Sequence, residues 1–227
     1  NIKLISKIKR AVKRNKGFIT FLFLMFFFRG AVADWYTIPS GSMQPTIEIG
    51  DRIIVDKTAY DLNFPFTDIS LFRTNEPKRG EIIVFDSQAA NIRLIKRVVG
   101  IPGDIISMKN EKLVINGKAL KYSELTREYS NTALLLNEDL AGLEHLVKYD
   151  QTREPTLANF GEVTVPDDHY LVLGDNRRNS TDSRVYGFIP RKELIGKANT
   201  VALSFNYDNY YLPKENRFWI DLYDEIE

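Results

Sequence analysis

Short β-branched segments separated by turn residues recur along most of this 227-residue chain, and they restrict the fold that it can adopt. Residues 51–57 (DRIIVDK), 81–85 (EIIVF) and 92–100 (IRLIKRVVG) have the length and composition of strands. An Asn116-Gly117 pair between two apolar runs predicts a β-hairpin. Further strands are expected at 163–165, 170–173, 200–205 and 217–222. Because these segments do not alternate with helices, the pattern predicts a mostly β fold with antiparallel sheets.

The strand pattern is interrupted after the turn sequence Ile101-Pro102-Gly103-Asp104. Residues 107–164 are polar and mixed, and they contain the one segment with helical periodicity, Asn137–Val147. We therefore expect a smaller α+β domain at 107–164, inserted into a β core formed by residues 34–106 and 165–227.

Composition excludes several kinds of site. The chain has no cysteine, so it has no disulfide, thiolate zinc site or cysteine nucleophile. Its two histidines, His145 and His169, do not form an HExxH pattern, and we predict no metal and no cofactor. Structural roles are expected for both histidines. A net charge of +1 gives no reason to expect a nucleic acid partner.

The N-terminus combines a basic segment, residues 1–16, with an apolar segment, residues 17–33. As a helix, the apolar segment is about 26 Å long, a little under a hydrocarbon core of about 30 Å. Ala31-Val32-Ala33 fits a cleavable secretory signal, whereas Arg29 fits an uncleaved anchor whose arginine reaches the outer interface. Both alternatives place the basic segment in the cytoplasm and export the rest. Because Asn1 stands where Met is expected, an earlier membrane segment could be missing.

Residues 60–79 are predicted to form a loop with four large apolar residues. A place in the core is favoured for them over a patch that rests on lipid. They are Phe64, Phe66, Leu71 and Phe72.

The stretch from Ile38 to Ile47 (IPSGSMQPTI) predicts a stiff turn that presents Ser42 at the surface. Its prolines restrict the backbone and Gly41 relaxes the local steric limits. A serine held in this way is a nucleophile only if a nearby group takes its proton, and an ordinary surface loop is the simpler interpretation of this stretch alone.

Lys96 is a candidate for that proton acceptor. On a strand over residues 92–99 it shares a face with Leu94 and Val98, while Arg93 and Arg97 point the other way. Burial among apolar groups lowers the pKa of a lysine, which is how general-base lysines arise. A lysine whose amine extends to solvent is the alternative.

A third polar stretch runs from Gly174 to Arg184 (GDNRRNSTDSR). Its Gly, Asn, Asp and Ser content predicts a loop whose side chains bond to its own backbone. Together with PSGSMQPTI, GDRIIVDK and KRVVGIPGD, this stretch resembles the successive sequence boxes of the bacterial type I signal peptidases, in the order found in that family. The boxes and their flanks cover most of residues 35–106 and 165–205, whereas residues 107–164 fit the family's variable second domain by position only.

The resemblance implies a Ser–Lys dyad serine protease. Ser42 would be the nucleophile and Lys96 its general base, with Ser180 orienting the lysine amine. The backbone N–H of Ser42 and the hydroxyl of Ser40 would form the oxyanion hole.

Further roles follow from the same resemblance. Asp182 and Arg184 would pair to hold the loop. The substrates would be secreted preproteins cut after an Ala-X-Ala pattern of small residues, bound as an added strand. Two shallow pockets would be lined by Ile38, Pro39, Met43, Leu94 and Ile95.

The resemblance also favours the uncleaved anchor, although Ala31-Val32-Ala33 remains a candidate for self-cleavage. We accordingly expect a single-pass protein of the bacterial cytoplasmic membrane, with its catalytic domain on the outer side, beside the lipid bilayer and the secretion translocon. An interfacial aromatic belt is predicted from Trp35, Tyr36, Tyr210, Tyr211, Leu212 and Trp219.

Two other functions remain as alternatives. The self-cleaving repressors of the bacterial damage response use the same kind of dyad, but they need a DNA-binding domain where this chain has its apolar segment. A membrane-tethered β module that binds without cutting would keep the fold and lack activity.

Overall fold

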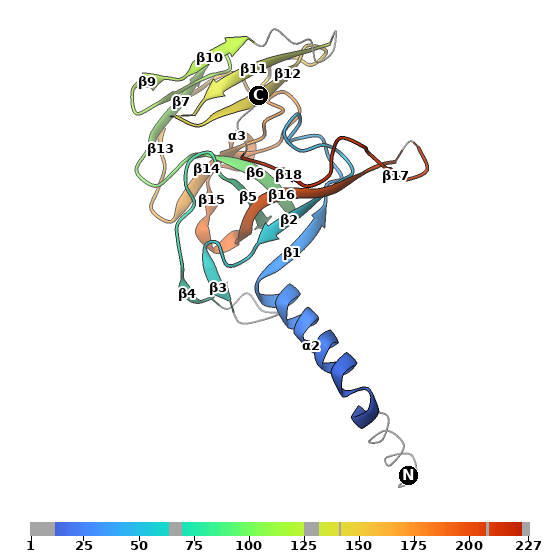
Figure 1. Cartoon of the computed structure of the whole chain (residues 1–227). Coiled ribbons are helices and arrows are strands. Elements are labelled where there is room, and N and C mark those ends of the chain that lie inside the picture. Colours follow the sequence, from blue (N-terminus) through green and yellow to red (C-terminus); the bar gives the residue numbers. More distant parts are fainter. Residues whose placement is uncertain (1–11, 64–69, 125–131, 141, 208, 224–227) are drawn as a thin grey trace.

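A computed structural model of the chain describes residues 12–63, 70–124, 132–140, 142–207 and 209–223. The predicted antiparallel β fold is confirmed: the largest sheet joins its strands in the order β1-β2-β16-β5-β6-β14-β15, and β17 and β18 pair with β16 (Figure 1). All of these pairs are antiparallel. The strands are β1 (Ala33–Thr37), β2 (Asp51–Asp56), β5 (Ile82–Ser87), β6 (Ile92–Gly100), β14 (His169–Leu173), β15 (Ile189–Pro190), β16 (Leu194–Asn206), β17 (Leu212–Pro213) and β18 (Ile220–Asp221). The strand expected at 217–222 is thus reduced to two residues.

Two smaller sheets lie together at the end of the molecule away from the N-terminal helix (Figure 1). One has the order β10-β11-β12 and the other the order β13-β7-β8-β9. Their strands are β7 (Ile105–Lys109), β8 (Lys112–Ile115), β9 (Lys118–Ala119), β10 (Lys121–Glu124), β11 (Ala133–Asp139), β12 (Glu144–Asp150) and β13 (Phe160–Thr164). The predicted Asn116-Gly117 hairpin joins β8 to β9, with positive φ at both residues. The domain boundaries at 107 and 164 stay predictions.

The helix expected at Asn137–Val147 is wrong, because this segment belongs to the hairpin of β11 and β12. In that hairpin Asn137 lies opposite Leu146. On β12 every second side chain is buried, namely those of His145, Val147 and Tyr149. Burial with a period of two is the signature of a strand, and pairing with a neighbouring strand overrides a weak helical spacing.

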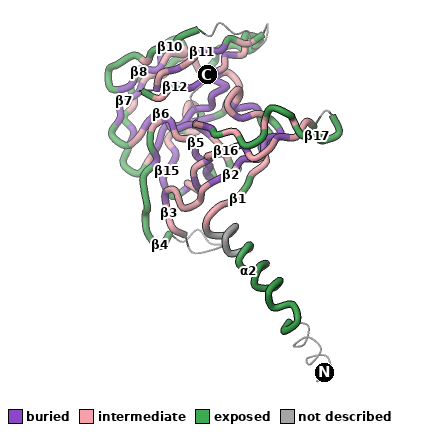
Figure 2. Tube along the Cα trace, viewed as in Figure 1, coloured by how far each residue is buried: buried purple, intermediate pink, exposed green. Residues whose placement is uncertain are grey.

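The N-terminal helix α2 (Lys16–Ala31) projects away from the β body (Figure 1). Among the described residues, no helix combines the length and the apolar character needed to cross a membrane. Figure 2 shows most of the described part of α2 in the colour of exposed residues. Phe18, Phe21 and Leu24 are among its exposed apolar residues.

The loop expected at 60–79 contains a two-stranded ribbon of β3 (Asp61–Asn63) and β4 (Ser70–Arg73). Leu71 and Phe72 are 56% and 58% exposed, so the core position predicted for them is wrong. All four residues of β4 are exposed, and a ribbon of two strands buries little apolar surface by itself. Phe64 and Phe66 lie outside the described residues.

Two short helical segments complete the described fold, α3 (Ser183–Tyr186) and the 3₁₀ turn η1 (Arg191–Glu193). The core of the large sheet alternates along its strands, as Ile53 and Val55 on β2 illustrate. Met43 and Ile47, which follow β1 in the chain, are fully buried in the same apolar cluster. This burial fixes the loop that carries Ser42.

Candidate active site

Ser42 and Lys96 lie together although 54 residues separate them in the chain. Ser42 is in the loop that follows β1, and Lys96 is in the middle of β6. The Nζ of Lys96 donates to the Oγ of Ser42 at 2.9 Å and to the carbonyl oxygen of Ile95 at 2.9 Å. The exposed fractions are 9% for Ser42 and 2% for Lys96. A hydroxyl and a buried amine are therefore within proton-transfer distance of each other.

The surroundings of Lys96 favour a neutral amine. Burial lowers its pKa to about 8, against the opposing influence of the carboxylates of Asp182 and Asp175, and the guanidinium of Arg184 lowers it further. With a pKa of about 8, roughly a tenth of the amines are neutral at pH 7. The neutral fraction is thus large enough for the amine to act as a base near physiological pH.

The backbone of the serine loop is held by Asn176, which the sequence interpretation did not identify. The backbone N–H of Asn176 donates to the carbonyl oxygen of Ser42 at 3.1 Å, and its side-chain amide donates to that of Gly41 at 3.0 Å. Asn176 is itself buried. Two hydrogen bonds from one buried residue hold the peptide units on either side of the Ser42 Cα.

Gly174 leaves room for the contact between this loop and Ser180. A Cβ at position 174 would lie 2.3 Å from the Oγ of Ser180 and 2.5 Å from the carbonyl oxygen of Ser42. Ser180 and Ser42 therefore both occupy the space that a side chain at position 174 would need. Among the described residues the buried Oγ of Ser180 has no hydrogen-bond partner, so the predicted bond to the Lys96 amine is not formed in this structure. The role of Ser180 stays a prediction.

Asp182 and Arg184 form the expected pair. The Nε and Nη2 of Arg184 donate to the two oxygens of the Asp182 carboxylate, both at 2.8 Å. Asp182 also accepts the backbone N–H of Gly174 at 3.0 Å, and Arg184 donates to the carbonyl oxygen of Arg177 at 2.8 Å. The pair thus joins both ends of the loop that contains Ser180.

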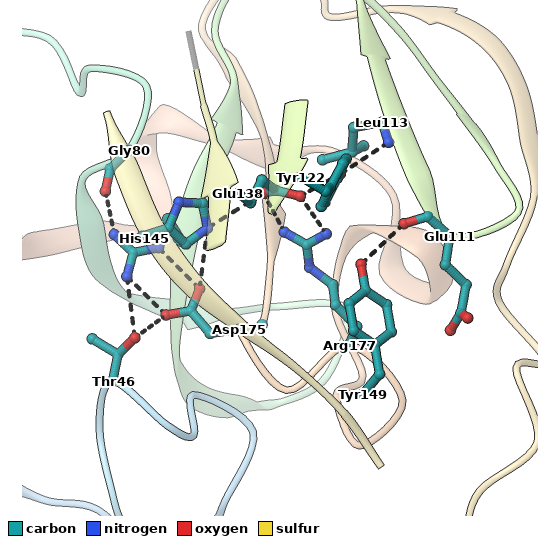
Figure 3. Close-up of polar contacts among 12 residues, drawn as sticks. Thr46, Gly80, Glu111, Leu113, Tyr122, Glu138, His145, Tyr149, Asp175 and Arg177 are labelled. Carbon is teal, nitrogen blue, oxygen red and sulfur yellow. Dashed lines mark hydrogen bonds and ion pairs between the residues drawn. The ribbon is translucent and has the colours of Figure 1, made fainter. Parts of the chain in front are cut away.

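A buried set of ionic side chains begins at Arg97, the residue after Lys96 on β6 (Figure 3). Arg97 donates to both oxygens of Asp175, at 2.9 and 2.8 Å. Arg177 donates to Glu138 at 2.8 Å, and the Nε2 of His145 lies 3.3 Å from the Glu138 carboxylate. We call these five side chains the buried charge cluster; it joins β6 and the 174–184 loop to β11 and β12.

The charges of this cluster balance. Burial would raise the pKa of Asp175, but the Arg97 guanidinium holds it below its usual range. Burial lowers the pKa of His145, and the nearby Arg97 lowers it further, so His145 is neutral. Two arginines and two carboxylates then compensate each other, which is the condition for keeping ions inside a protein. His145 has the structural role expected from the sequence.

Backbone contacts reinforce the same junction. The N–H of Lys148, on β12, donates to the carbonyl oxygen of Asp175 at 2.8 Å, and the N–H of Arg177 donates to that of Lys148 at 2.9 Å. The loop that positions Ser42 therefore forms an isolated parallel bridge with β12, between Asn176 and Lys148.

The residues predicted to line substrate pockets are only partly brought together. Ile38 and Met43 are buried in one apolar cluster, and the half-buried Ile95 packs against that cluster. Leu94 packs against a different cluster, on the other face of β6. Pro39 and the predicted oxyanion-hole residue Ser40, the two residues before Gly41, are both exposed.

Two strand edges near the dyad are unpaired. Within the described residues β1 pairs with β2 alone, and the first half of β6 (92–96) pairs with β5 alone, since β14 joins β6 only from Arg97 onward. Side chains from these two edges meet, because the Arg93 guanidinium lies 4.9 Å from the centre of the Tyr36 ring. An unpaired edge is a template for another strand.

Comparison with known proteins identifies the family. The family model described as "Signal peptidase, peptidase S26" matches residues 11–203. The chain belongs to this family. It is therefore a hydrolase of the signal peptidase class, and the matched range includes Ser42, Lys96 and the 174–184 loop.

Family relatives resemble the chain over most of its length. The chain is 34% identical to "Signal peptidase I" of Pseudomonas fluorescens over 218 residues and 36% identical to that of Pseudomonas aeruginosa over 222 residues. Each match covers 90% of this chain and 76% of the relative. A crystal structure of a signal peptidase I from Enterococcus faecalis V583 is 31% identical, with a TM-score of 0.35, and the match covers 54% of this chain and 97% of that one.

The residues that the sequence interpretation missed share one property: each is a polar or charged side chain in the interior. Arg97 was assigned correctly to the face of β6 opposite Lys96, but its burial on that face was not predicted. The sequence did contain a signal for this burial. In residues 96–100 (KRVVG) the two cations are followed by consecutive apolar residues, whereas a strand with one solvent-exposed face alternates apolar and polar residues.

Proposed function

We propose that this signal peptidase is a membrane-bound serine endopeptidase that removes N-terminal signal peptides from exported preproteins. It would cut after small residues in an Ala-X-Ala pattern, with Ser42 as nucleophile and Lys96 as general base. The observation that carries the proposal is the 2.9 Å hydrogen bond between a buried amine of lowered pKa and the hydroxyl of Ser42.

Acylation begins when the Ser42 Oγ attacks the scissile carbonyl carbon and the neutral amine of Lys96 takes the hydroxyl proton. The resulting oxyanion accepts hydrogen bonds from the backbone N–H of Ser42 and the hydroxyl of Ser40; one such donor typically contributes about 2.7–4 kcal/mol. As the C–N bond breaks, the Lys96 ammonium returns a proton to the leaving amine. The signal peptide remains as an ester on Ser42 and the mature protein departs.

Deacylation repeats these proton transfers with water. The amine of Lys96 removes a proton from a water molecule as its oxygen attacks the ester carbonyl. The tetrahedral intermediate collapses, the Oγ of Ser42 recovers the proton from Lys96, and the signal peptide leaves with a free carboxylate. No step requires a metal or another cofactor.

An added strand is the proposed mode of substrate binding. The unpaired edges of β1 and of the first half of β6 would hold the preprotein backbone, and small side chains at the first and third positions before the cut would face the apolar cluster of Ile38, Met43 and Ile95. Larger side chains would be rejected by clash, since that cluster is filled.

Location at a membrane is part of the proposal. Exposed apolar side chains on α2, and a basic segment before it, suit an anchor in the bacterial cytoplasmic membrane with the β body outside, near the translocon that delivers preproteins. The exposed Trp35, Tyr210, Tyr211 and Trp219 would then contribute to an interfacial aromatic belt.

Cleavage of a preprotein in detergent micelles by wild type, Ser42→Ala and Lys96→Met tests the function. We expect kcat/KM to fall at least about a thousandfold in both variants, and N-terminal sequencing of the product to place the cut after Ala-X-Ala. Ser123→Ala and Lys121→Met make the same chemical changes on the exposed strand β10 and should leave the rate unchanged.

Equal rates in all five proteins would refute the dyad. Binding of the preprotein with no cleavage by wild type would favour the alternative of a tethered β module without proteolytic activity.

A further inference from the structure

Arg93 crosses between the two unpaired strand edges of the site. It stands directly opposite Asp86 in the β5–β6 pair, and its Nε and Nη2 donate to the two Asp86 oxygens at 2.8 and 2.7 Å. The same guanidinium lies over the ring of Tyr36, on β1. Asp86 therefore orients a cation that extends from one free edge to the other.

The contact between Arg93 and Tyr36 lies along the path of the proposed substrate strand, before the dyad. The inference therefore rests on the proposed function. Four antiparallel pairings lead from β1 to β6, so the two strands run in the same direction. Tyr36 precedes Ser42 by six residues and Arg93 precedes Lys96 by three, so both lie toward the start of β1, the end of that strand next to α2. Figure 1 shows where α2 meets β1. A signal peptide that reaches the dyad from the membrane passes this side with the residues that precede the small pair.

Strand geometry identifies the position that meets Arg93. Arg93 and Ile95 are two residues apart, so they share one face of β6. If the third residue before the cut faces Ile95, the next residue on the same face of the substrate strand is the fifth. The fifth side chain is thus the one presented to the Arg93 guanidinium.

We propose that Arg93 is a specificity-determining residue that favours acidic or hydrogen-bond-accepting side chains at the fifth position before the cut and disfavours Lys and Arg there. Its Nη1 has no hydrogen-bond partner among the described residues, so the group has donors left over after binding Asp86. The Arg93 side chain is 44% exposed, which leaves it accessible to a passing chain. Charge–charge preference at such an exposed site is modest and weakens with added salt.

The experiment uses the full chain in detergent micelles and four preproteins that keep Ala at the first and third positions and carry Asp, Ser, Leu or Lys at the fifth. For wild type, we expect kcat/KM to be about fivefold higher for Asp than for Lys at low ionic strength, and the ratio to shrink in 0.5 M salt. Arg93→Ala should bring the ratio close to one, and Arg93→Glu should invert it.

Two further variants make the test specific. Asp86→Asn frees Arg93 from its partner and should broaden the preference without removing it, because the cation remains. Lys121→Ala removes a cation from the exposed strand β10 and should leave the ratio as in wild type.

Affinity of the same four preproteins for Ser42→Ala, measured by fluorescence anisotropy, reports the preference without catalysis. A wild-type ratio near one, or a ratio that Arg93→Glu leaves unchanged, overturns the inference while the proposed function stands. A wild type that cleaves none of the four overturns the proposed function and this inference with it.

Discussion

The two halves of β6 carry the same kind of ion pair in opposite surroundings. Arg93, in the half with an unpaired edge, binds both oxygens of Asp86 on the surface. Arg97, in the half enclosed by β5 and β14, binds both oxygens of Asp175 in the interior. Lys96 occupies the boundary between the halves, where the strand passes from solvent into the core.

The difference between the two ion pairs shows that one half of β6 can interact with a substrate while the other half stabilises the fold. The exposed pair is surrounded by water, which screens it, so a substrate can compete for the guanidinium at small cost. No water screens the buried pair of Arg97 and Asp175, so removing either ion leaves the other as an uncompensated charge in the interior. Between them, burial lowers the pKa of the Lys96 amine to about 8, so that part of it is neutral near physiological pH.

The largest expected effect separates the two arginines by stability. Arg97→Met should lower the free energy of unfolding by about 3–5 kcal/mol, because the Asp175 carboxylate stays buried and loses its counter-ion. Arg93→Met should change it by less than about 1 kcal/mol. Urea denaturation followed by tryptophan fluorescence measures both.

A double variant, Arg97→Met with Asp175→Asn, serves as the control. It should recover part of the loss, since no lone ion remains. If Arg93→Met and Arg97→Met lower the free energy of unfolding equally, burial does not distinguish the ion pairs in the two halves of β6.

The next effect concerns the boundary residue and pH. Because the neutral amine is the active form and its pKa is lowered to about 8, kcat/KM should rise about tenfold from pH 7 to a plateau above pH 8. Unfolding returns the lysine to its ordinary pKa of 10.5, so between pH 8 and 10.5 the unfolded chain binds more protons and wild-type stability rises with pH.

Lys96→Met cannot titrate at this position, so its unfolding free energy should lack that rise and should exceed that of wild type at pH 7. Chemical denaturation at pH 7, 9 and 10.5 compares the two proteins. A flat pH–rate profile between pH 6 and 9 would contradict a neutral-amine base.

The smallest effect concerns the open half of the strand. Ile95→Ala should remove bulk from the apolar cluster that faces the third substrate position, and preproteins with Val there should be cleaved about fivefold better relative to Ala. Cleavage of a matched Ala/Val pair measures this ratio. Leu94→Ala, on the other face of β6, is the control; a shift of the same size in that variant would place the third side chain elsewhere.

The sequence predicted the local features well. Alternating β-branched residues indicated most strands, and the Asn116-Gly117 pair indicated its hairpin, because both signals depend on neighbours in the chain. Ser42 and Lys96 were identified from the resemblance to the family, and the apolar neighbours Leu94 and Val98 gave an independent reason to expect a lysine of lowered pKa.

Long-range pairing was not predictable in this way. Arg97 and Asp175 are 78 residues apart, and the sequence around each residue contains no signal that identifies its partner. The strands β11 and β12 were mistaken for a helix because their apolar spacing also fits one, and only the pairing of Asn137 with Leu146 decides between them. Leu71 and Phe72 lie on β4, whose four residues are all exposed, and that exposure is a property of the assembled fold.

The junction between β12 and the 174–184 loop limits how far this protein can be shortened. Deleting residues 107–164 would remove Glu138, His145 and the backbone of Lys148, and would leave Arg177 without its carboxylate inside the remaining β body. A minimized version made for crystallization or inhibitor screening therefore has to retain β11 and β12.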